Sequence, residues 1–227
     1  MKKIITALMF VALSSVSAKA FDMSSFALTG GIKTHSSVFG ASGKNHDHDD
    51  TSANTIVKTT SGEGVFTETF SSYLIELGIG KYISLGYEHT PDSISTPTNE
   101  NDGRSGGQKI SVDFNDLNTQ YVKFNVPGGL YVTYGSMDVD LDIKESEGAF
   151  RNVSTSGTRT GIGYERHFGE SGFGIRIEGN YLEMDNVSTD DTVTGSVSNN
   201  GRNSADVKNL EGLTAGLGLT YTFGRNY

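Results

Sequence analysis

The sequence predicts an all-β fold, an eight-stranded antiparallel up-and-down transmembrane β-barrel. Three observations support this prediction: an export signal at the N-terminus, segments with an apolar residue at every second position, and connections that alternate between long and short. The clearest segment is 213–223, where Leu, Ala, Tyr and Phe alternate with Gly and Thr. A strand with this period has one apolar and one small polar face. Because the polar face lacks the Lys and Glu that usually solvate a surface, we expect lipid outside and a narrow polar interior.

The first 20 residues have the pattern of a secretory signal peptide. A basic start at Lys2 and Lys3 precedes an apolar run over 4–13 and a small-residue cleavage site that ends at Ala20. The apolar run is too short for a membrane-spanning helix, which needs about 20 residues. We therefore expect cleavage after Ala20 and a barrel domain over 21–227.

Composition narrows the functional classes. The chain of 227 residues has a net charge of -9, and removal of a signal peptide with three lysines and no acidic residue leaves -12. Such a chain lacks the basic surface that neutralises phosphate, so we expect no nucleic-acid partner. It contains no Cys and therefore no disulfide framework. The 29 Gly, 10 Tyr and 12 Phe are also compatible with a soluble all-β domain. Such a domain would not explain why long and short connections alternate along the chain.

Eight strands are predicted along the chain, at 25–34, 67–77, 83–88, 117–126, 131–143, 158–168, 173–181 and 209–223. Long polar segments at 35–64, 90–116, 144–157 and 185–208 alternate with short turns at 78–80, 127–130 and 169–172. Strands of about ten residues are long enough to cross a bilayer at a tilt, and short periplasmic turns with long outer loops are typical of bacterial outer-membrane barrels. In 131–143, three apolar residues (Met137, Val139, Leu141) alternate with three acidic ones (Asp138, Asp140, Asp142).

These features resemble the eight-stranded outer-membrane β-barrel class that includes the OmpA transmembrane domain, OmpX, OmpW and opacity-type surface proteins. The closing segment, Gly218-Leu219-Thr220-Tyr221-Thr222-Phe223, is similar to the aromatic-terminated signal read by the barrel-insertion machinery. The resemblance implies an assembly signal at Gly218, Tyr221 and Phe223, and a location in the outer membrane of a Gram-negative bacterium. It also implies contact with membrane lipid and lipopolysaccharide. The chain departs from the pattern because four residues, 224–227, follow the terminal aromatic.

Eight charged residues fall on the predicted interior faces: Lys33, Glu76, Glu88, Lys123, Arg159, Glu165, Arg176 and Glu178. A barrel of eight strands is just wide enough for side chains to fill it, and an unpaired buried charge costs on the order of several kcal/mol. Four basic and four acidic groups can neutralise one another, which favours a salt-bridged plug over the gate of a narrow channel. Interior glycines at 161, 163, 174, 216 and 218 are expected to leave discontinuous water-filled pockets.

The turn at 169–172 also predicts a register. Closing it symmetrically sets Phe168 opposite Phe173, and counting outward sets Glu165 opposite Arg176. These two residues should form an ion pair close to the periplasmic rim.

The histidines suggest two further kinds of site. The run 46–50, His-Asp-His-Asp-Asp, contains competent metal ligands, but charged loop segments are usually only solvated, so we expect no metal at His46 and His48. His89 and His167 have no Ser and acid grouped with them in a recognisable motif, so we expect neither an enzyme nor a cofactor. The expected function is that of a monomeric barrel with a structural or surface-interaction role. The alternative is a narrow porin-like channel for small solutes or ions.

Overall fold

The computed structural model describes residues 26–49, 52–101, 108–145, 152–190 and 203–224. The strands are β1 (Phe26–Asp49), β2 (Ser52–Ile79), β3 (Ile83–Thr90), β4 (Ile94–Ser95), β5 (Asn99–Asn101), β6 (Gln108–Asn125), β7 (Leu130–Glu145), β8 (Val153–His167), β9 (Phe173–Met184), β10 (Val187–Asp190) and β11 (Asn203–Phe223). Within these ranges no helix is long and apolar enough to cross a membrane. The predicted signal peptide, residues 1–20, lies outside the described residues.

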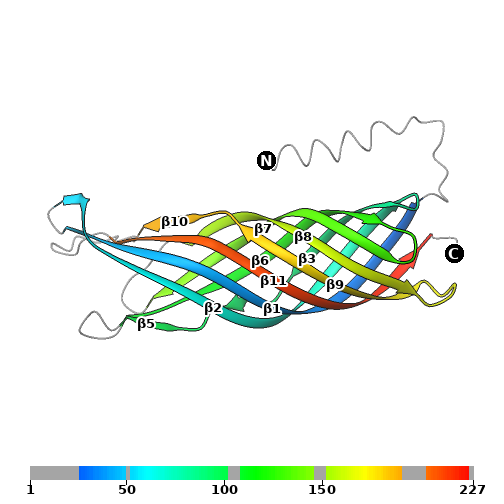
Figure 1. The fold of residues 1–227 in the computed structure, drawn as a ribbon, viewed down its shortest axis with the longest axis horizontal. Coiled ribbons are helices and arrows are strands. Elements are labelled where there is room, and N and C mark those ends of the chain that lie inside the picture. Colours follow the sequence, from blue (N-terminus) through cyan, green and yellow to red (C-terminus); the bar gives the residue numbers. More distant parts are fainter. Residues whose placement is uncertain (1–25, 50–51, 102–107, 146–151, 191–202, 225–227) are drawn as a thin grey trace, which may run out of the picture.

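Eight long strands form one closed antiparallel barrel. Their order is β1-β2-β3-β6-β7-β8-β9-β11, and β11 pairs back with β1 from Leu28↔Phe223 to Asp47↔Asn203. The short strands β4 and β5 pair with β6, and β10 pairs with β11. Figure 1 shows the resulting long cylinder, in which β1 begins and β11 ends at the same end. The predicted all-β, eight-stranded barrel is therefore confirmed.

The short turns join β2 to β3, β6 to β7 and β8 to β9. Gly128 and Gly129 have φ angles of 94° and 91°, a region that residues with a side chain rarely adopt, and Val126 N–H donates to the Leu130 carbonyl at 2.7 Å. The predicted turn at 78–80 is displaced, because β2 continues to Ile79 and the chain turns at 80–82.

The first long connection is not a loop. The predicted loop at 35–64 is wrong, because β1 runs on to Asp49, β2 starts at Ser52, and the two pair along nearly this whole length. Ladder hydrogen bonds use backbone groups, so the hairpin continues although few apolar residues mark it. A membrane crossing needs about 9–11 residues, whereas β2 has 28. The barrel wall therefore extends well past the length that a bilayer requires.

The half of the barrel near the short turns has an apolar outer surface. Large apolar side chains point outward there and are about half exposed or more, among them Leu28, Ile32, Ile75, Phe124, Ile162, Ile177, Leu217 and Leu219. Aromatic side chains, including Phe173, Phe223 and Tyr134, belong to the same surface. Water would not stabilise so large an exposed apolar belt, whereas lipid does. This belt is the membrane-facing surface.

The opposite half reverses this polarity. Met137, Val139 and Leu141 are 1%, 3% and 2% exposed and point into the barrel, while the acidic residues between them lie on the outer face. The expectation of lipid outside and a narrow polar interior is therefore wrong for this half of β7. Past the apolar belt the surroundings are water, so the apolar side chains turn inward and the carboxylates outward.

Candidate functional site in the barrel lumen

The structure places all eight predicted charged residues inside the barrel. Seven are at most 5% exposed: Lys33, Glu76, Glu88, Lys123, Arg159, Arg176 and Glu178. The eighth, Glu165, lies nearest the periplasmic turns and has a side chain that is 8% exposed. Period-two alternation explains this placement, because each residue sits on the inward face of its strand. The eight residues form two clusters, one above the other along the lumen.

The cluster near the short turns is centred on Glu76 of β2. Its carboxylate accepts two hydrogen bonds from the Arg176 guanidinium, both at 2.8 Å, and one from Lys123 Nζ at 2.5 Å. Glu165 Oε2 lies 3.0 Å from Lys123 Nζ and 3.1 Å from Arg176 Nη2. The Thr220 hydroxyl donates to the other oxygen of Glu165 at 3.1 Å. Two acids and two bases thus compensate one another.

The second cluster is centred on Glu88 of β3. Glu88 Oε2 accepts from Lys33 Nζ at 2.6 Å and from Arg159 Nη1 at 2.7 Å. Lys33 Nζ also donates to Glu178 Oε1 at 2.5 Å, so one ammonium bridges two carboxylates. His35, Glu88 and Glu178 bring possible metal-ligand atoms within 4.8 Å of one another. Because Lys33 Nζ already bonds to both carboxylates, its ammonium group occupies the position that a metal ion would take.

Two buried tyrosines join the clusters. Tyr131 donates its hydroxyl to Glu178 of the second cluster at 2.9 Å, while Arg176 of the first cluster lies over its ring, 5.3 Å from the centroid. Tyr121 does the converse: its hydroxyl donates to Glu76 at 2.7 Å, and Arg159 lies 4.8 Å from its ring centroid. Cations over aromatic faces are attracted electrostatically, so the tyrosines link the two clusters into one network.

The predicted register of the last periplasmic hairpin is confirmed. Glu165 is the direct partner of Arg176, as Tyr164 is of Ile177, and the two charged side chains form an ion pair. Phe168 N–H donates to the Phe173 carbonyl at 2.8 Å, which closes the turn between them.

The lumenal glycines leave less space than predicted. A Cβ at Gly163 would lie 2.2 Å from the Tyr131 ring, and one at Gly161 would lie 2.2 Å from Asn180 Oδ1. At Gly174, Gly216 and Gly218 the nearest side chains are those of Thr220, His35 and Lys33. The expectation of water-filled pockets at these glycines is therefore wrong, because larger neighbours occupy the space that each missing side chain leaves.

Several members of the network were not among the predicted residues. Tyr131 lies in the first half of its strand, where apolar and polar residues do not alternate regularly. His35 lies in the segment that was expected to be a loop. His35 Nε2 lies 2.9 Å from Ser72 Oγ and 3.1 Å from Glu88 Oε1. Continuing the alternation of β1 two residues beyond Lys33 would have placed His35 inside the lumen.

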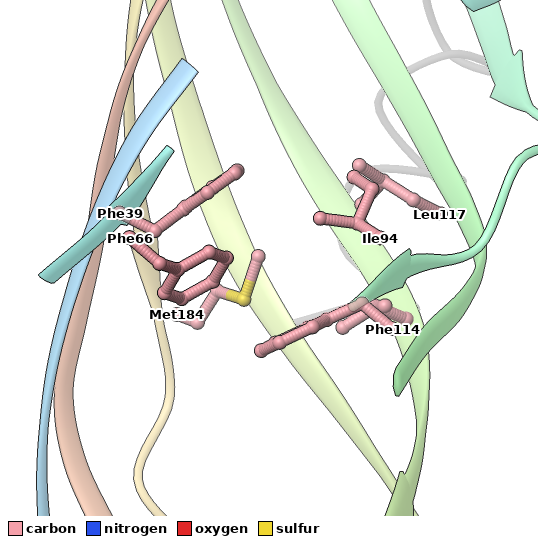
Figure 2. Close-up of a pocket in the computed structure, with 7 residues that line it drawn as sticks. Phe39, Phe66, Ile94, Phe114, Leu117 and Met184 are labelled. Carbon is pink, nitrogen blue, oxygen red and sulfur yellow. The ribbon is translucent and has the colours of Figure 1, made fainter. Parts of the chain in front are cut away.

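Above the network the lumen is apolar. Aromatic stacking links Phe39 to Phe66 at 5.3 Å and Phe66 to Phe114 at 6.2 Å between ring centroids. A small cavity of about 10 Å³ lies within this cluster, and Figure 2 shows its lining. The lining residues are Phe39, Phe66, Ile94, Phe114, Leu117, Val139 and Met184. The lumen thus contains charged groups at membrane level and apolar groups beyond it.

The residues proposed as an assembly signal lie on both faces of β11. Phe223 is 60% exposed on the outer surface, and its ring contacts that of Tyr221 at a centroid distance of 4.4 Å. Gly218 faces the lumen, where a Cβ would lie 2.7 Å from Lys33 Cγ. Residues 225–227 lie outside the described residues, and the signal role stays a prediction.

The histidines outside the lumen contact ordinary polar groups. His46 Nδ1 lies 3.0 Å from Thr59 Oγ1, and its Nε2 lies 3.5 Å from Asp206 Oδ2. His89 Nδ1 lies 2.8 Å from Asn118 Oδ1. The side chain of His48 lies outside the described part of the chain.

Zinc or calcium is expected to leave the thermal stability of the protein unchanged, because His46 already contacts neighbours within the sheet. The check is thermal unfolding with and without each metal, for the wild type and for the double variant His46→Ala, His48→Ala. A metal-dependent rise in the melting temperature that the double variant loses would show that this end of β1 binds metal.

A closed eight-stranded barrel with an apolar outer belt defines an integral outer-membrane β-barrel protein. Comparison with known proteins agrees at the level of the fold. No protein-family model matches the sequence, and no curated protein matches it. The solved structure of the outer membrane protein OprG from Pseudomonas aeruginosa is similar to this chain, with a TM-score of 0.60 at 10% sequence identity. The similarity covers 86% of this chain and 96% of that one.

Two further solved structures are less similar. AlkL, determined in lipid bilayers, has a TM-score of 0.42 at 14% identity and covers 85% of this chain and 90% of its own. Ail of Yersinia pestis, in complex with a heparin analogue, has a TM-score of 0.39 at 12% identity and covers 85% of this chain and 99% of its own. At 10% identity, the similarity to OprG supports the fold alone.

Proposed function

We propose that this protein is a closed, monomeric outer-membrane barrel that does not conduct solutes and that acts at the cell surface in a structural or interaction role. The observation that carries the proposal is the lumenal network of four acids and four bases. Lys33, Glu76, Glu88 and Arg176 are each at most 3% exposed and are bonded to partners from other strands. Such a network fills the narrow interior of an eight-stranded barrel.

The network argues against the alternative function, that of a narrow channel. An ion crossing the lumen would have to separate groups that are 2.5 to 2.8 Å apart, such as Lys33 and Glu178 or Arg176 and Glu76. Breaking a buried pair by removing one partner costs about 3–5 kcal/mol, because the other charge is left uncompensated. Beyond the network a permeating ion would also meet Phe39, Phe66 and Phe114, which offer no polar group.

The surface role is supported by the wall beyond the apolar belt. There β1 and β2 extend far past a bilayer crossing, and the outer face of β7 presents Asp138, Asp140 and Asp142. We assign no catalytic function to this surface. Membrane lipid and lipopolysaccharide are the proposed contacts of the belt, and the barrel-insertion machinery is the proposed partner during assembly.

Reconstituted protein is expected to show no steady conductance in planar bilayers and no uptake of sugars into liposomes, because the paired side chains leave no continuous aqueous path. Recordings on the wild type are compared with those on Glu165→Ala and Arg176→Ala. Single-channel steps in the wild type whose size changes in either variant would establish the narrow channel instead, with the network as its gate.

A further inference from the structure

A larger cavity lies on the outer face of the barrel wall, apart from the lumen. Its volume is about 210 Å³, many times the roughly 10–15 Å³ that a single water molecule requires. Three neighbouring strands line it: β6 with Asp116 and Asn118, β7 with Asp138 and Asp140, and β8 with Ser154 and Ser156. The cavity is therefore large enough to hold a small polar ligand or the polar end of a larger one.

The cavity exists because β6 is bulged beside a regular ladder. Pairing between β6 and β7 is interrupted between Asn115 and Asn118, and Asp116 has a φ angle of 51°, which few residues other than glycine adopt. Asn118 Nδ2 donates to the Asp116 carbonyl at 2.7 Å and so holds the bulge in place. On the other side, β7 and β8 pair without a register shift. The cavity thus belongs to the wall of the barrel and not to a connecting loop.

The cavity lies at the upper rim of the apolar belt, on the side away from the short turns. Tyr87 is 43% exposed on the belt, and its hydroxyl donates to Asn118 Oδ1 in the cavity wall at 2.6 Å. Tyr134 is 58% exposed and lies four residues before Asp138 on the same face of β7. Aromatic side chains of this kind lie at the level of the lipid head groups. The cavity therefore borders the head groups of the outer leaflet.

The lining of the cavity is acidic. It includes three carboxylates, those of Asp116, Asp138 and Asp140, and none of its eight lining residues is basic. Lys144, further along the same face of β7, forms its ion pair with Asp113, which does not line the cavity. Hydrogen bonds between a cationic donor and a carboxylate are stronger than those between neutral groups. The ligand that matches this lining carries a positive charge and N–H donors.

Negative charge also borders the belt on the other side of β8. Tyr181 of the belt is 40% exposed, and Glu183 follows it by two residues on the same face of β9. Glu183 is the direct ladder partner of Glu211 of β11, and both are exposed. Like charges directly opposite each other destabilise a ladder. Cationic lipid head groups around the rim compensate both sites, whereas a soluble ligand in the cavity compensates only one, so a lipid is the better match.

From these observations we propose that the cavity beside Asp138 and Asp140 binds the primary ammonium head group of a membrane lipid. An ammonium group has three N–H donors, and the carboxylate and hydroxyl oxygens of the lining accept them. The acyl chains of the same lipid lie against the apolar belt below. The inference rests on the proposed contact between belt and membrane lipid, and it adds the head-group chemistry and the residues that recognise it.

The probes are phosphatidylethanolamine and phosphatidylcholine with identical acyl chains, which have the same net charge but differ in N–H donors. Both are added in equal amounts to the folded protein in detergent micelles, and the retained lipid is counted by native mass spectrometry. The wild type should retain phosphatidylethanolamine with a preference of roughly tenfold. The double variant Asp138→Asn, Asp140→Asn should lose this preference. Asp142→Asn is the matched control, because Asp142 follows Asp140 on the same face of β7 without lining the cavity, and it should keep the preference.

Retention of the gel shift on boiling verifies that each variant is folded. Equal retention of the two lipids by the wild type would overturn the proposal, as would an unchanged preference in the double variant or an equal loss in Asp142→Asn. Free ethanolamine is the competing soluble amine, and if it abolishes the preference when equimolar with the lipid, the cavity takes a soluble ligand instead. Retention of neither lipid refutes the proposed lipid contact of the belt itself, whereas equal retention of both refutes only the head-group site.

Discussion

Replacing Glu76 with Ala should destabilise the folded barrel by about 3–5 kcal/mol, because it leaves buried cations without their counter-charge. Glu76 is 1% exposed and accepts hydrogen bonds from Arg176, Lys123 and Tyr121. Glu165 alone would then face both cations. The measurement is equilibrium unfolding by urea in lipid vesicles, followed by loss of the gel shift that a folded barrel shows before boiling.

The matched control is the ion pair between Lys144 and Asp113 near the outer end of the wall. The Lys144 side chain is 58% exposed, and water screens an exposed pair. Lys144→Ala should leave the unfolding midpoint close to that of the wild type. If Glu76→Ala and Lys144→Ala shift the midpoint equally little, the lumenal network does not stabilise the barrel and the plug interpretation fails.

The second large effect is expected from Gly86→Ala. A Cβ at Gly86 would lie 2.2 Å from the Tyr121 ring, which is 2% exposed and cannot move aside freely. The Tyr121 hydroxyl is bonded to Glu76, and Arg159 lies over its ring. One added methyl group therefore displaces a side chain that joins both charged clusters. Overpacking of this kind costs about 1–3 kcal/mol, and the disturbed network should bring Gly86→Ala to the upper end of that range.

Gly30→Ala is the control for this prediction. Gly30 lies in β1, where an added Cβ would meet nothing within 4 Å, so the variant should unfold close to the wild-type midpoint. Both variants are compared by the same urea titration. Equal midpoints for Gly86→Ala and Gly30→Ala would show that the Tyr121 ring is not confined as the structure has it.

Local pattern was enough to predict the parts of this protein that depend on near neighbours in the chain. The pairing of Glu165 with Arg176 follows from one short turn and the two-residue period of a strand, and the structure has the same register. The inward position of the charged residues follows from that period as well. By contrast, Glu76 meets Arg176, 100 residues away, across the lumen. Such a contact depends on how the strands close and stagger, which no short segment encodes.

The local sequence pattern also did not predict how far the barrel wall extends beyond the membrane. Few apolar side chains occur in 35–49 and 52–64, so a polar loop was predicted there. The backbones of these two segments nevertheless pair in a long hairpin. Hydrogen bonds between strands do not depend on side-chain polarity, which is why alternation did not reveal them. The inward apolar positions Phe39 and Phe66 contribute to a core only because β6, β7 and β9 face them across the lumen.

The amino-acid pattern alone predicts a barrel of eight strands with an apolar outer belt and a lumen of balanced charge. These properties are carried by composition and by a two-residue period, and both are local. The folded barrel was needed to show which charges meet, that Tyr121 and Tyr131 join them, and that the polarity of the wall reverses beyond the belt. The physical reason is that a side chain's partners and solvent depend on its height along the closed barrel, which is set by the strands on either side.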